Sequence, residues 1–136
     1  YALVPFAGDW LRSRAYQQAH NFAVPLHGVA SSVHEGPLPP ASALITAEPP
    51  ELVLSTLKRS EDSMRLILRA WNISEGPIDA HITLPTFVRS ATLAGLDEIP
   101  APPAGGTSRL QWTAGPPPSV SLRVGAREII TLSLEV

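Results

Sequence analysis

Proline and glycine recur along this whole chain and divide it into short segments. Its 136 residues include 15 prolines and 9 glycines. Proline lacks a backbone N–H and fixes φ, so it interrupts helices and the interior of sheets. We interpret the three densest clusters as loops, at Gly36 to Pro40, Pro100 to Gly106 and Gly115 to Pro118. Short apolar runs separated in this way favour a β-sandwich or a β-barrel.

Three of the runs between these loops have the two-residue period of a half-buried strand. In Ile78 to Leu84 the even-numbered residues are apolar and the odd-numbered residues are polar, which predicts one face in contact with water. The same alternation occurs in Val120 to Val124 and in Glu128 to Val136, where the even-numbered residues would point inward.

Other runs predict further strands with less regular patterns. Glu51 to Lys58 and Met64 to Trp71 are more uniformly apolar, as expected of central strands, and Arg59 to Ser63 supplies a hairpin turn between them. The weaker strand candidates are Ser42 to Ala47, Val88 to Leu93 and Ser108 to Thr113.

One stretch near the start of the chain follows a helical period. We expect a short helix at about Trp10 to His20, with Asp9 placed to cap its first turn. The apolar stripe of this helix consists of Leu11, Ala15, Ala19 and Phe22. The sequence as a whole therefore predicts an all-β fold, an antiparallel β-sandwich with one short N-terminal helix, as a single domain over residues 1–136.

Composition excludes several classes of partner. Apolar residues make up 44% of the chain, charged residues 16%, and the net charge is −2, so we expect neither disorder nor nucleic-acid binding. No apolar run approaches the roughly 20 residues that cross a bilayer, so we expect no membrane partner. Cysteine is absent, which removes disulfides and thiolate chemistry.

Several segments, in the same order along the chain, resemble one known family. They are Tyr1 to Trp10, Asn21 to Leu26, Leu38-Pro39 followed by Ser42 to Leu44, Val53 to Asp62, Ile67 to Asn72, Ala91 to Glu98 and Glu128 to Leu132. Together they are similar to the C-terminal region of bacterial-type α-mannosidases of glycoside hydrolase family 38. Two positions differ: Phe6 stands where the family has His, and Asn21-Phe22 has the reverse order.

The resemblance implies a non-catalytic domain of a larger enzyme. The family's catalytic carboxylates and zinc ligands belong to an N-terminal α/β barrel, so we expect no catalytic residue and no metal in these 136 residues. The parent enzyme would hydrolyse terminal α-mannosides with retention of configuration, using zinc, in the bacterial cytoplasm. The C-terminal domain would pack on that catalytic domain and shape its substrate cleft.

The same resemblance predicts an interaction surface at the start of the chain. Tyr1 to Trp10 is interpreted as a strand and turn of a larger β region. We expect an exposed apolar patch there, through which the isolated chain would self-associate as a homo-oligomer.

An independent carbohydrate-binding module is the alternative function. Tryptophan can stack on a sugar ring, and Trp112, beside the proline-rich loop, is the best candidate for that role. We expect Trp71 to pack beneath the central sheet instead. A fibronectin-like adhesive domain is a third hypothesis, which requires the ordered resemblance to be a coincidence.

Arg69 stands out because it carries a fixed charge inside an apolar strand. One interpretation is an internal ion pair with Glu48, Glu51 or Asp79. The other is that Arg69 faces the missing barrel, as an interdomain or substrate-cleft residue.

The remaining ionisable residues suggest no chemistry of their own. Glu61-Asp62 and Asp97-Glu98 are interpreted as solvated turns, and His81 as a surface histidine. His20, His27 and His34 recur every seven residues, but Pro25 and Gly28 prevent one continuous helix.

Overall fold

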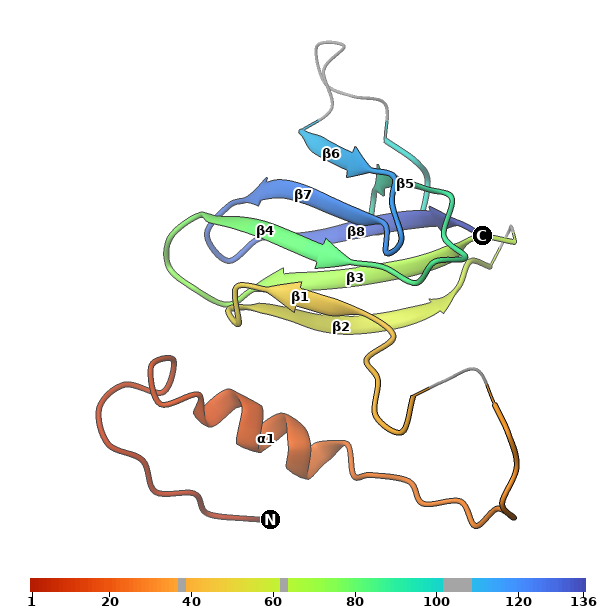
Figure 1. Ribbon diagram of the computed structural model, residues 1–136. Coiled ribbons are helices and arrows are strands. Elements are labelled where there is room, and N and C mark those ends of the chain that lie inside the picture. Colours follow the sequence, from red (N-terminus) through yellow and green to blue (C-terminus); the bar gives the residue numbers. More distant parts are fainter. Residues whose placement is uncertain (37–38, 62–63, 102–108) are drawn as a thin grey trace. The chain divides into compact units, whose positions relative to one another are not determined.

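The computed structural model describes residues 1–36, 39–61, 64–101 and 109–136. These residues form two compact units, Tyr1–Ser42 and Ala43–Val136 (Figure 1). The helix belongs to the first unit and every described strand to the second. The interpretation of residues 1–136 as one domain stays a prediction. Parts of the expected loops and the first residue of one expected strand, at 37–38, 62–63 and 102–108, lie outside the described residues.

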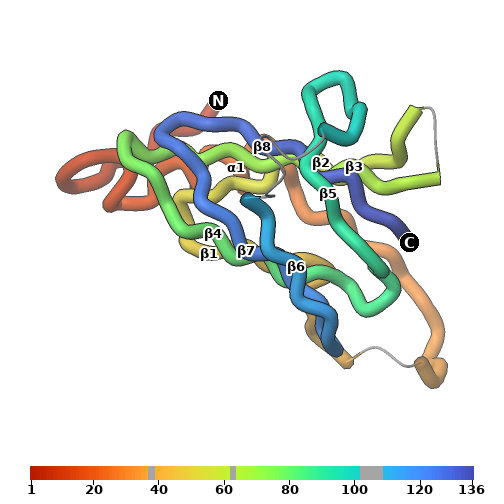
Figure 2. Tube along the Cα trace, turned by 90° about the horizontal axis from the view of Figure 1, so that it is seen from above, coloured from red at the N-terminus to blue at the C-terminus, as the bar shows by residue number. Residues whose placement is uncertain are grey.

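The second unit is a sandwich of two antiparallel sheets, which Figure 2 shows as separate layers. The first sheet has the order β1 (Thr46–Glu48), β4 (Ile78–Thr83), β7 (Ser119–Val124) and β6 (Leu110–Thr113). The second sheet has the order β2 (Leu52–Arg59), β3 (Leu66–Asn72), β8 (Ile129–Glu135) and β5 (Ser90–Ala94). Each strand expected between Ser42 and Val136 overlaps one of these, and the all-β antiparallel sandwich with one short helix is confirmed.

The core lies between the two sheets because alternation sends one set of side chains inward from each strand. Ile82 of β4, Val120 of β7 and Leu132 of β8 are completely buried. Asp79 and His81, the odd-numbered neighbours on β4, are exposed, as the alternation predicts. Burying a large aliphatic side chain stabilises a fold by about 1.5–3 kcal/mol, so these rows are the main stabilising element of the sandwich.

Two expectations about the second sheet were wrong. The Glu51 to Lys58 run forms β2, which lies at the edge of its sheet and not at the centre. Its pairing with β3 is interrupted by a bulge between Leu54 and Thr56, and it ends in charged residues, both features of edge strands. Trp71 is 40% exposed and not beneath the sheet, because it lies on the face of β3 opposite to Leu68 and Ala70, which belong to the core between the sheets.

A buried asparagine joins two turns at one end of the sandwich. The side chain of Asn72, at the end of β3, is completely buried. Its amide group donates hydrogen bonds to the carbonyl oxygens of Gly76 (2.9 Å) and Gly125 (2.7 Å), and its Oδ1 accepts one from the backbone N–H of Ser74 (2.9 Å). These bonds satisfy a polar group that would otherwise destabilise the core.

The first unit contains α1, which spans Ala15–Ala23 and begins later than expected. Asp9 caps the preceding turn, where its Oδ1 accepts hydrogen bonds from the backbone N–H groups of Leu11 (2.8 Å) and Arg12 (3.0 Å). Arg14 then adopts a left-handed conformation (φ 55°), which separates that turn from the helix. Tyr1 to Trp10 contains no strand, so its interpretation as a strand and turn was wrong about the strand.

Candidate functional site

Arg69 lies on the outer face of the second sheet, where it is partly buried and bonded to two neutral groups. Its Nε donates to Thr131 Oγ1 of the adjacent strand β8 (3.3 Å), and its Nη2 donates to the carbonyl oxygen of Leu96 (3.2 Å). Within the described part of the chain, no ion pair joins Arg69 to Glu48, Glu51 or Asp79, so the expected internal ion pair was wrong. Whether Arg69 serves an interface or a cleft stays a prediction.

The loop after β5 approaches the same face of the second sheet. Its Glu98 carboxylate accepts a hydrogen bond from Lys58 Nζ of β2 (2.7 Å). The loop is closed by the backbone N–H of Gly95, which donates to the carbonyl oxygen of Ile99 (3.0 Å). The Glu98 side chain is only 13% exposed, so the interpretation of Asp97-Glu98 as a solvated turn holds for the exposed Asp97 and was wrong for Glu98.

The electrostatics of the carboxylates with perturbed pKa values argue against acid catalysis. The hydrogen bond from Lys58 holds the pKa of Glu98 below its usual 4.5, with the charge of Arg69 adding to the effect. The hydrogen bond from Arg109 (2.6 Å) likewise lowers the pKa of Glu128. A glycosidase acid needs a raised pKa so that it is protonated near neutrality. Neither carboxylate has the property of a proton donor.

The Trp112 side chain is not fully exposed for stacking on a sugar ring. It lies on β6, is partly buried and packs against the core cluster between the sheets. Trp71 is the more exposed tryptophan of the sandwich. Trp10, in the first unit, makes an edge-to-face contact with Tyr16, with ring centroids 6.3 Å apart. Sugar stacking by Trp112 stays a prediction.

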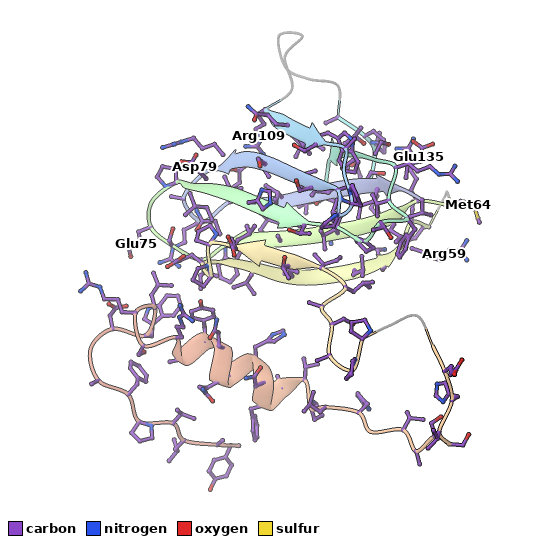
Figure 3. All side chains as sticks on the ribbon, viewed as in Figure 1. Arg59, Met64, Glu75, Asp79, Arg109 and Glu135 are labelled. Carbon is purple, nitrogen blue, oxygen red and sulfur yellow. The ribbon has the colours of Figure 1, made fainter. Side chains whose placement is uncertain are left out.

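The outer face of the first sheet carries an open polar groove of about 470 Å³. His81 of β4 contacts Ser121 of β7, with Nδ1 and Oγ 3.0 Å apart. Figure 3 labels Asp79 and Arg109 at the same groove. The alternation in the sequence places His81 and Ser121 on the wet face of their strands. It does not reveal that β4, β7 and β6 are neighbours, and so it misses the groove.

The remaining histidines of the described chain do not form part of a group of metal ligands. The helix ends at Ala23, so His27 and His34 lie beyond it, as expected from Pro25. Among the residues that the structure describes, no three His, Asp or Glu side chains are placed to hold a metal ion. The described residues therefore do not fit a zinc site.

The first unit has an apolar hollow of about 380 Å³. It is lined by Ala2, Val4, Phe6, Ala15, Gln18, Ala19 and Phe22. The helix that forms one side of the hollow has no buried residue, and Phe6 and Phe22 are at least half exposed. No helix in the described ranges is long and apolar enough to cross a bilayer.

The two antiparallel sheets define the class of an all-β sandwich domain. Residues 51–132 match the family model of the glycosyl hydrolases family 38 C-terminal beta sandwich domain. The chain belongs to this family and is a non-catalytic domain of a family 38 glycoside hydrolase. No curated protein and no solved structure matches it.

The matched range includes most, but not all, of the segments that carry the resemblance. Val53 to Asp62, Ile67 to Asn72 and Ala91 to Glu98 lie inside it, together with Glu128 to Leu132. Tyr1 to Trp10, Asn21 to Leu26 and Leu38-Pro39 with Ser42 to Leu44 lie outside it. The family is therefore shown by the sandwich, and the role of the first unit is a separate question.

Proposed function

We propose that this chain is the C-terminal domain of an α-mannosidase and that it docks on the enzyme's catalytic barrel through its first unit. The observation that carries the proposal is the exposure of that unit. Residues 1–36 and 39–42 include no buried side chain. Its exposed large apolar residues are Tyr1, Leu3, Val4, Phe6, Trp10, Phe22, Val24, Leu26, Val29 and Val33.

Such exposure is costly for a segment that folds alone. The nine residues of α1 are fewer than the 12–15 or so at which isolated helices become stable in water. A helix of this length needs tertiary contacts along its apolar face, and the hollow between Phe6 and Phe22 is open to receive them. An exposed apolar surface of this kind marks an interaction site.

In this proposal the chemistry belongs to the parent enzyme. The barrel would supply the carboxylates and the zinc for retaining hydrolysis of terminal α-mannosides. The described residues hold no metal-ligand group, so no step of the reaction is assigned to them. The domain would stabilise the barrel, and Arg69 would help to close one side of the cleft.

The docking role is tested by placing a charge in the apolar hollow of the full-length enzyme. Phe22→Asp should lower the melting temperature of the enzyme by at least about 2–4 °C, because a carboxylate would replace a ring that docking would bury. Asn21→Asp adds the same charge to a neighbouring exposed position of α1 and should change little. Both variants should leave the stability of the isolated 136-residue chain unchanged.

Two outcomes would contradict the docking role. One is equal melting temperatures for the Phe22→Asp and Asn21→Asp enzymes. The other is an equal loss of stability on Phe22→Asp in the isolated chain, since that would place the packing partner of Phe22 within these 136 residues.

The cleft role of Arg69 needs a kinetic measurement. Arg69→Ala in the full-length enzyme should lower kcat/KM for an α-mannoside by about tenfold, which corresponds to about 1.4 kcal/mol of lost transition-state stabilisation. Arg59→Ala is the matched control, because Arg59 is exposed on the neighbouring strand β2. A normal rate constant with unchanged stability would remove Arg69 from the cleft.

A further inference from the structure

The polar groove on the first sheet has no part in the docking role proposed above. Its floor is the backbone of two neighbouring strands at Ala80 of β4 and Leu122 of β7, whose side chains point into the core. Its walls are the outward side chains of three strands and the residue before β6: Asp79, His81, Arg109, Gln111, Ser121 and Arg123. The groove is therefore formed by the paired strands β4, β7 and β6.

Strand register arranges these side chains in two parallel rows. His81 of β4 pairs with Ser121 of β7, which pairs with Gln111 of β6. Two residues further along the same face, Asp79 pairs with Arg123. Neighbouring strands are about 4.8 Å apart, and two residues along a strand span about 7 Å. One sugar ring with its hydroxyl groups is large enough to reach both rows.

The groove has little net charge, which argues against an anionic ligand. Arg123 Nη1 lies 3.2 Å from Asp79 Oδ1, and Arg109 Nη2 lies 2.6 Å from Glu128 Oε1. Because the pKa of Glu128 is lowered, its carboxylate stays ionised and keeps the Arg109 charge neutralised near neutral pH. Both guanidinium groups are already paired, so neither offers an uncompensated charge to a phosphate or a carboxylate.

Polar atoms nevertheless remain available in the row of neutral residues. His81 uses Nδ1 toward Ser121, which leaves Nε2 directed elsewhere. In the described part of the chain, neither His81 Nε2 nor the side-chain amide of Gln111 has a hydrogen-bond partner. An imidazole, an amide and a hydroxyl offer both donors and acceptors. A sugar hydroxyl is itself both a donor and an acceptor, so this mixed set suits a polyol better than an ion.

We propose that this groove binds a neutral glycan, with the hydroxyl groups of one sugar residue hydrogen-bonded to His81, Ser121 and Gln111. The binding is weak, with Kd of the order of millimolar, because the groove is open and has no aromatic platform. Trp112, which follows Gln111 on β6, packs against the core on the opposite face. The proposal is independent of docking on the barrel, because the groove lies within the second unit alone.

The test is a titration of the ¹⁵N-labelled 136-residue chain with α-linked mannobiose, followed by NMR. Backbone amides of β4, β7 and β6 and the side-chain amide of Gln111 should shift and saturate, while those of β2 and β3 should not. Gln111→Ala and His81→Ala should each weaken binding by about tenfold, the usual effect of losing one hydrogen bond. Thr113→Ala is the matched control, because Thr113 is an exposed residue of β6 that does not line the groove.

Further ligands define the chemistry of the site. Saturation by cellobiose as well as mannobiose supports the proposal and makes the groove unselective among neutral glycans, whereas saturation by mannobiose alone ties it to substrate-type sugars. Binding of sodium sulfate with no response to either disaccharide would overturn it. So would the absence of saturable shifts at about 50 mM disaccharide, well above the expected Kd. An equal loss of affinity in the Thr113→Ala chain would also overturn it.

Discussion

Leu132 in β8 is completely buried, whereas Leu3 in the first unit is 89% exposed. The same type of side chain is thus buried in the second unit and exposed to solvent in the first. In β4, β7 and β8 of the second unit apolar residues recur every second position, so strand pairing collects them between two sheets. In Tyr1–Ser42 only α1 has a regular stripe, and that stripe is short. The second unit therefore contains its own core, whereas the described residues of the first unit are apolar without one.

The largest difference between the units should appear in amide hydrogen exchange of the isolated chain. Backbone amides of β3 and β8 should be protected at least about a thousandfold, because they exchange only when the sandwich opens. Amides of α1 should be protected by less than about tenfold, because a helix this short is marginal without a partner. Comparable protection in α1 and β8 would mean that the first unit has found a packing partner within the chain.

Substitution of a leucine should affect the free energy of unfolding much more in the second unit than in the first. Leu132→Ala should reduce the free energy of unfolding by about 2–5 kcal/mol, because it removes buried methyl groups and leaves a cavity. Leu3→Ala should change it by less than about 0.5 kcal/mol. Urea unfolding measures both. If Leu3→Ala cost as much as Leu132→Ala, the contrast between the two units would be incorrect.

Buried polar groups allow a finer comparison. Asn72→Ala should cost about 2–3 kcal/mol, because the carbonyl oxygens of Gly76 and Gly125 would lose their donor in a buried place. Asn21→Ala, in the exposed helix of the first unit, is the control and should be nearly neutral. Equal urea midpoints for the two variants would show that the Asn72 bonds do not stabilise the sandwich.

The smallest expected effect concerns the loop after β5. Because the pKa of Glu98 is lowered from its usual 4.5, its contribution to stability is present above that value and is lost as pH falls through the lowered pKa. Glu98→Gln should therefore flatten the loss of stability in acid. Urea midpoints measured from about pH 7 down to about pH 3 test this.

The matching control for Glu98 is Glu61→Gln. Glu61 contacts the same Lys58 at 3.3 Å, but its side chain is 82% exposed. An acid response that is identical in the two variants would mean that the lower exposure of Glu98 does not make its ion pair with Lys58 more stabilising.

The fold was largely predictable because alternation is a local property. Ile78 to Leu84 and Glu128 to Val136 read as strands from their own residues, and β4 and β8 occupy those positions. The predictions were wrong where a property depends on strands that are distant in the sequence. Whether β2 is central or at an edge depends on which strands pair with it, and the exposure of Trp71 depends on what covers the outer face of its sheet.

The candidate sites were less predictable for the same reason. Arg69 was recognisable as a charge in an apolar strand, but its partners, Thr131 and Leu96, are 62 and 27 positions away. The polar groove needs the pairing of β4 with β7 and of β7 with β6, which no single segment encodes.

Neighbouring residues alone predict the two-residue period of the strands, the loop at Gly115 to Pro118 and the resemblance to family 38. Which strands are neighbours, and therefore which polar side chains share a face, depends on long-range strand pairing. The free energy gained by burying apolar side chains favours the two-residue period within each strand. Long-range pairing of the strands decides which side chains lie next to each exposed residue.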